Sequence, residues 1–107
     1  MRVIWPTDAE DQLEEIFEFE SQKDPAYAAD VYNTIIEEAD KLAALPEMAS
    51  KELSLEDVPG EYRSLIIQSR YKVIYRFYPD AEEIMVASVW DCRQDPETLK
   101  KKATKKK

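Results

Sequence analysis

Two basic side chains stand among aromatic and aliphatic ones along residues 71–78, a segment that reads YKVIYRFY. Residues two apart on a β-strand share a face, so this spacing would place four side chains together: Lys72, Ile74, Arg76 and Tyr78. Cations beside aromatic rings suit the binding of an acidic, amphipathic segment of a partner protein. A simpler reading stays open, because exposed cations on a strand also deter edge-to-edge aggregation.

The residue types that nucleophilic and metal chemistry need are scarce. The 107-residue chain has no histidine, one cysteine and one glycine. Because no histidine is present to activate Cys92, we expect no nucleophilic role for its thiol. A single glycine cannot build a phosphate-binding loop. Without a histidine or a tight acidic loop, we expect neither a metal ion nor an organic cofactor.

The apolar spacing predicts a strand, two helices and then three strands. The expected strands cover residues 2–5, 62–67, 71–78 and 84–90, and the expected helices cover residues 8–22 and 25–45. Thr7 or Asp8 would cap the first helix. Asp24 would cap the second helix, with Pro25 at its first position and Pro46 ending it. Residues 47–60 show no period, so we expect a loop with a short strand near Leu53.

This order predicts an α+β domain with the element order β-α-α-β-β-β. A helical hairpin would pack on one face of an antiparallel sheet of about four strands. We expect a single domain over residues 1–99 and a basic, disordered tail over residues 100–107. Both faces of the strands are apolar, so the pattern does not decide which face meets the helices. The sheet face that the helices do not cover would form a groove for a partner. Trp90 could belong to the core or to this groove.

Charge and hydropathy exclude several classes of function. The formal net charge is −8, and residues 8–57 hold sixteen acids against three lysines. A field this negative repels nucleic acid in general. No apolar run approaches the roughly 18 residues that a membrane-spanning helix needs, and the N-terminus becomes acidic too early for a signal peptide. With one cysteine and no possible internal disulfide, we expect a cytoplasmic protein that does not enter membranes.

Several fixed points in this order resemble the RelE/ParE superfamily of bacterial type II toxins, which includes the plasmid stabilisation proteins. The points are RVIW with Ala9 and Leu13, the helix end at Leu42, Leu45 and Pro46, the pair Tyr62–Arg63, YKVIY at residues 71–75, and VWDCRQDPETL at residues 89–99. The resemblance covers residues 2 to about 99. It implies a toxin that inhibits growth and is neutralised by a cognate antitoxin, whose C-terminal segment wraps the toxin.

The resemblance also implies site residues. Those expected to bind a partner are Arg63, Lys72, Ile74, Arg76, Tyr78, Trp90 and Arg93. RelE-like relatives cut messenger RNA in the ribosome with a basic cluster. If this chain is RelE-like, Arg63 and Arg93 would stabilise the phosphate and Lys51 would assist, so these three would be the catalytic residues. In the simpler reading, Arg63 pairs with Glu61, and Arg93 pairs with its acidic neighbours.

The chain departs from the RelE-like pattern at two positions. Trp90 stands where many RelE-like relatives have a histidine, and no tyrosine follows Tyr78. RNA cleavage needs a group that activates the 2′-hydroxyl, so these departures weaken a nuclease reading. They favour the ParE-like branch, whose members inhibit DNA gyrase and are not known to cut RNA. An mRNA endoribonuclease and an inert, antitoxin-binding relative are the alternatives.

Overall fold

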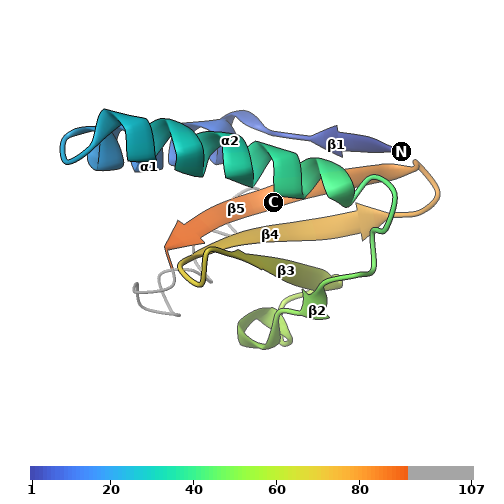
Figure 1. Ribbon diagram of the computed structural model, residues 1–107. Helices are drawn as coiled ribbons and strands as arrows, with labels where there is room; N and C mark the ends of the chain where they lie inside the picture. The colour runs from blue at the N-terminus through green and yellow to red at the C-terminus, as the bar shows by residue number, and fades with distance from the viewer. Residues whose placement is uncertain (92–107) are drawn as a thin grey trace.

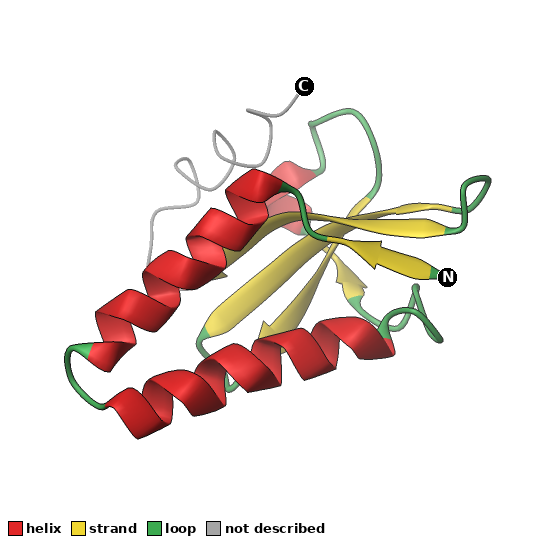
Figure 2. Ribbon diagram, turned by 90° about the horizontal axis from the view of Figure 1, so that it is seen from above, coloured by secondary structure: helices red, strands yellow, loops and turns green. Residues whose placement is uncertain are grey.

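Two helices lie on one face of a single sheet in the computed structural model, which describes residues 1–91 (Figure 1). The elements are β1 (Arg2–Ile4), α1 (Thr7–Ser21), α2 (Pro25–Lys41), β2 (Ser50–Lys51), the short 3₁₀ helix η1 (Leu53–Leu55), β3 (Tyr62–Ile67), β4 (Tyr71–Tyr78) and β5 (Glu83–Asp91). Seen from above, the helices are joined by a short turn and diverge from it (Figure 2). The α+β class with a helical hairpin on a sheet is therefore confirmed.

The sheet has the strand order β1-β5-β4-β3-β2. The pairs β2–β3, β3–β4 and β4–β5 are antiparallel, whereas β1 runs parallel to β5. The expected sheet of about four antiparallel strands thus gains a two-residue fifth strand and one parallel pair. The helical hairpin separates β1 from the next strand along the chain, β2. Strand β1 pairs instead with the last strand, β5, and runs parallel to it.

The helix boundaries follow local signals only in part. Asp24 caps α2 as expected, because its carboxylate accepts hydrogen bonds from the backbone N–H groups of Ala26 and Tyr27. The expected cap on α1 is wrong: Pro6 occupies that position and no side chain caps the helix. The expected end of α2 at residue 45 is also wrong. The helix ends at Lys41, because residues 42–44 form i→i−3 hydrogen bonds of the tighter 3₁₀ type.

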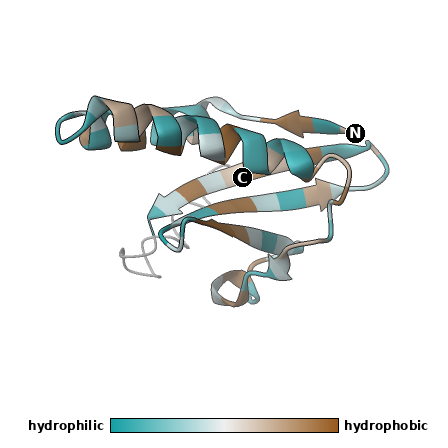
Figure 3. Cartoon of the chain, viewed as in Figure 1, coloured by the Kyte–Doolittle hydropathy of each residue, from teal (hydrophilic) through white to brown (hydrophobic). Residues whose placement is uncertain are grey.

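The helices pack against the sheet face that carries Tyr71, Val73 and Tyr75. One cluster makes up most of the core between the helices and this face: Ala9, Leu13, Val31, Ile35, Ile67, Tyr71, Val73, Val86 and Val89. Tyr75 joins an adjoining cluster with Leu42, Ala49 and Ile84. Figure 3 shows the matching alternation of hydrophobic and hydrophilic residues along α2, the helix in front. This face is called the helix-side face below.

The opposite face, called the far face below, is covered in part by residues 53–58. Leu55 and Val58 from this segment pack with Tyr62, Ile74, Ala87 and Trp90 of the sheet. The expected short strand near Leu53 is wrong in place, since β2 lies at residues 50–51 and Leu53 opens η1. Both faces of the strands are apolar because each has its own cover. Within residues 1–91, no helix is long and apolar enough to cross a membrane.

Candidate partner-binding face

Arg76 lies on the far face between two tyrosine rings. Its guanidinium carbon is 4.9 Å from the ring centre of Tyr78 and 5.9 Å from that of Tyr62. Gly60, at a φ of +106°, lies directly against the guanidinium, and a Cβ added there would be 2.6 Å from Arg76 Cζ. In the part of the chain that the structure describes, Arg76 pairs with no carboxylate. Two rings and one glycine therefore hold a positive charge that has no anionic partner there.

Lys72 lies on the same face, but its charge is already paired. Its Nζ is 2.9 Å from Oε1 of Glu52, a residue only 6% exposed. Burial by itself would raise the pKa of Glu52, but hydrogen bonds from Ser54, Lys72 and Ser64 outweigh burial and leave that pKa below its usual value. The ion pair fastens the start of the 53–58 cover to β4. Lys72 therefore has a structural task in the free chain.

Arg63 lies on the helix-side face, away from Arg76. Its Nη1 donates a 2.7 Å hydrogen bond to the Ala49 carbonyl. Its Nη2 is 3.0 Å from a carboxylate oxygen of Glu61 and 3.7 Å from one of Glu47. The simpler reading of this residue, a pairing with Glu61, is thus what the structure has. Arg63 ties the segment that leaves α2 to the edge of the sheet.

Lys51 and Arg63 are register partners across β2 and β3, so the structure does bring these two candidate residues together. Lys51 Nζ is 3.7 Å from Oε1 of Glu61, the same carboxylate that Arg63 contacts. Two cations thus share two nearby acids, Glu61 and Glu47, and their positive field is largely cancelled. Arg93 and Cys92 lie outside the described residues, as do the expected basic tail and the end of the proposed domain.

Five of the seven candidate binding residues share the far face: Lys72, Ile74, Arg76, Tyr78 and Trp90. Ile74 is 0% exposed and Trp90 is 3% exposed, since both lie beneath the 53–58 cover. They are core residues in this structure, and the open groove expected around them is filled by the chain itself. Lys72, Arg76 and Tyr78 are only partly buried, and of these three the charge of Lys72 is already paired with Glu52.

Two residues that shape the far face were missed in the sequence. Gly60 leaves room for the guanidinium of Arg76, and Tyr62 supplies one of the two rings. Gly60 stood out as the single glycine of the chain, but nothing in the sequence linked it to Arg76. Tyr62 stands at the start of an expected strand and in the Tyr62–Arg63 pair of the family resemblance, but neither observation placed its ring against Arg76. The pairs Lys72–Glu52 and Arg63–Glu47 join segments far apart in the chain, and no local pattern predicts them.

A buried charge cluster lies at the opposite end of β4. Glu20, at the end of α1, is 2% exposed. Its carboxylate accepts a hydrogen bond from the Tyr71 hydroxyl and is 3.0 Å from Nη1 of Arg70. Burial, followed by the hydrogen bond to Glu20, raises the pKa of Tyr71 far above its usual value. These groups join α1 to the β3–β4 turn and are part of the fold.

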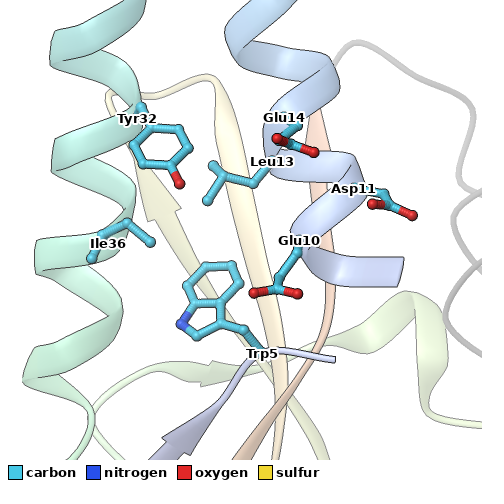
Figure 4. A pocket seen from close by; sticks show the side chains of 7 residues that line it. All are labelled: Trp5, Glu10, Asp11, Leu13, Glu14, Tyr32 and Ile36. Atoms are coloured by element: carbon cyan, nitrogen blue, oxygen red, sulfur yellow. The ribbon is translucent and has the colours of Figure 1, made fainter. Parts of the chain in front are cut away.

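A pocket of about 310 Å³ opens between α1 and α2 (Figure 4). It is lined by Trp5, Glu10, Asp11, Leu13, Glu14, Tyr32 and Ile36. None of its three carboxylates forms an ion pair within residues 1–91, so the rim is negative and repels phosphate. No group of three or more His, Cys, Asp or Glu side chains in that range is placed to hold a metal ion.

Comparisons with known proteins identify the class to which this fold belongs. Residues 3–96 match the model of a family described as "ParE toxin of type II toxin-antitoxin system, parDE". This chain therefore belongs to the ParE toxin family, and its resemblance to the RelE/ParE superfamily is confirmed.

A solved structure, described as "Chromosomal ParDE TA system from P. aeruginosa", has the same fold. The superposition has a TM-score of 0.70 and 19% sequence identity, and it covers 85% of this chain and 95% of that chain. No curated protein sequence gave a significant match.

Proposed function

We propose that this ParE-family toxin acts by binding a protein target of the DNA gyrase type and does not cut RNA. The observation that carries the proposal is the pairing at Arg63. RNA cleavage needs arginines free to meet a phosphate and a group that activates the 2′-hydroxyl. Here Glu61 and Glu47 occupy Arg63, and Glu61 also neutralises Lys51. The chain has no histidine to serve as the base.

We also propose that a cognate antitoxin neutralises this toxin and binds its far face, with the two chains meeting in the cytoplasm. The mixed basic and aromatic surface around Arg76 and Tyr78 supports this, because an acidic, amphipathic segment is its chemical complement. The similar solved structure belongs to a ParDE toxin–antitoxin system, which supports the same assignment.

Induced expression in bacteria tests the proposed function. We expect arrested growth, filamented cells with altered nucleoids, and no new messenger RNA 5′ ends within codons. Arg63→Gln is the matched variant, and it should remain toxic as long as it folds, because Arg63 holds the structure and performs no chemistry. New mRNA ends that disappear in Arg63→Gln would contradict the proposal and support the endoribonuclease. Normal growth would leave the inert, antitoxin-binding relative.

A further inference from the structure

We infer that Arg76 is a preorganised receptor for one carboxylate of the antitoxin. The inference deepens the proposed function and rests on it, because it names the chemistry by which the far face recognises that partner. It also separates Arg76 from Lys72 and Arg63, which the sequence placed in the same candidate set.

Arg76 differs in its charge pairing from the other cations of the described sheet. Each of the other cations on the described strands, and on the turns that join them, contacts a carboxylate: Arg2, Lys51, Arg63, Arg70 and Lys72. Arg76 pairs with none within residues 1–91, although the chain has 23 acidic residues. Its donors on the far face are therefore committed to no carboxylate of residues 1–91, which leaves them for an acidic group of the antitoxin.

The guanidinium of Arg76 is held in place before a partner binds. An arginine on an open surface loses rotamer freedom when it binds, and this loss weakens the contact. The rings of Tyr62 and Tyr78 and the bare Cα of Gly60 already restrict the guanidinium of Arg76. A planar guanidinium fixed in this way can form a two-pronged hydrogen bond with a carboxylate, which is the geometry that arginine favours.

A single carboxylate fits Arg76 better than a nucleic acid does. A nucleic acid presents a row of phosphates and needs several free cations along its path. The described part of the far face offers one, because Lys72 is held by Glu52. The net charge of −8 also opposes any polyanion. A single carboxylate on an amphipathic protein segment matches a single arginine. The ring of Tyr78 and the partly buried Met85, which is the register partner of Arg76, suit an apolar neighbour.

The test measures binding of the purified antitoxin encoded beside this chain, with matched variants of the toxin. Arg76→Gln should weaken binding about 10- to 100-fold. It should lower the melting temperature less than Lys72→Gln does, since it loses two ring contacts but breaks no ion pair within residues 1–91. Arg76→Lys should restore part of the affinity. Lys72→Gln, on the same face, should do the reverse and lower the melting temperature with little change in affinity. Equal affinity for wild type and Arg76→Gln would overturn the inference.

A charge swap identifies the partner group. Arg76→Glu should abolish tight binding, and replacing one acidic residue of the antitoxin by arginine should restore it. If no acidic position restores binding, the inference is wrong. A 20-nucleotide DNA probe that binds wild type but not Arg76→Gln would likewise overturn it in favour of a nucleic acid. If the antitoxin fails to bind wild type, this inference and the proposed antitoxin partner both fall, whereas intact binding with an inert Arg76 removes only this inference.

Discussion

Arg63 and Tyr75 are register partners on β3 and β4, and both donate hydrogen bonds to carbonyl groups of the segment that leaves α2. The Tyr75 hydroxyl reaches the Pro46 carbonyl and Arg63 Nη1 reaches the Ala49 carbonyl, each at 2.7 Å. The two side chains thus close the connection between the helical layer and the edge of the sheet. A residue that the family pattern suggested as catalytic has its donors taken up by the fold.

Arg63→Gln should lower the free energy of unfolding by about 1–3 kcal/mol, because it leaves the Ala49 carbonyl and two carboxylates without their donor. Urea denaturation measures the change. The matched control is Lys51→Gln, whose exposed and longer ion pair should be worth less than about 0.5 kcal/mol. If both substitutions cost the same, Arg63 does not tie the segment that leaves α2 to the edge of the sheet.

Tyr75→Phe should destabilise the chain by about 1 kcal/mol, because it removes one hydroxyl hydrogen bond from a fully buried ring. The double variant with Arg63→Gln should cost less than the sum of the two single changes, since both side chains hold residues 46–49. A double-mutant cycle in urea provides the measurement. Strict additivity would show that the two contacts act on the segment independently.

Stability should fall at alkaline pH. Burial raises the pKa of Tyr75, and burial with the hydrogen bond to Glu20 raises that of Tyr71. The pKa of each tyrosine is therefore higher in the folded chain than the unfolded value of 10.0. The stability that the two protonated tyrosines contribute is complete below pH 10 and is lost as the pH rises above it. Unfolding free energies across this range should therefore decline. Tyr71→Phe should flatten the decline, and the partly exposed control Tyr78→Phe should keep it. An equally steep decline in Tyr71→Phe would contradict the assignment.

Acid should loosen the far-face cover. The pKa of Glu52 in the folded chain lies below its ordinary value of 4.5. The stability that the ionised Glu52 carboxylate contributes is therefore present above pH 4.5 and is lost as the pH falls through the folded pKa. Glu52→Gln should cost about 2 kcal/mol at neutral pH and should weaken the loss of stability in acid. The exposed neighbour Glu56 provides the control, and Glu56→Gln should leave the acid profile as it is in the wild type. A Glu52→Gln profile that matches wild type would show that the Lys72 pair does not hold the cover.

The parts of the fold that could be predicted depend on local chemistry. The Asp24–Pro25 start of α2 was predictable because a capping carboxylate and a fixed φ act within three residues. The end of α2 was not, because residues 42–44 form tighter turns before Pro46 rather than a regular helix. The parallel β1–β5 pair depends on where the helices carry the chain, and no local pattern encodes that path.

The candidate site shows the same division. Alternation along residues 71–78 correctly placed Lys72, Ile74, Arg76 and Tyr78 on one face. The sequence could not show that Leu55 and Val58, from a segment without a period, would cover Ile74 and Trp90. It could not separate Arg63 from Arg76 either. Glu61 lies two residues before Arg63, so their pairing was one open reading of the sequence. The contact of Arg63 with Glu47, and the lack of a carboxylate at Arg76 within residues 1–91, follow only from the tertiary structure.

The most direct test of the central claim is a supercoiling assay with purified DNA gyrase and purified toxin, run beside a translating lysate that contains a labelled message. We predict that micromolar toxin inhibits supercoiling, that added antitoxin reverses the inhibition, and that the message stays intact. Unaffected gyrase together with codon-positioned cuts in the message would contradict the claim and identify an mRNA endoribonuclease.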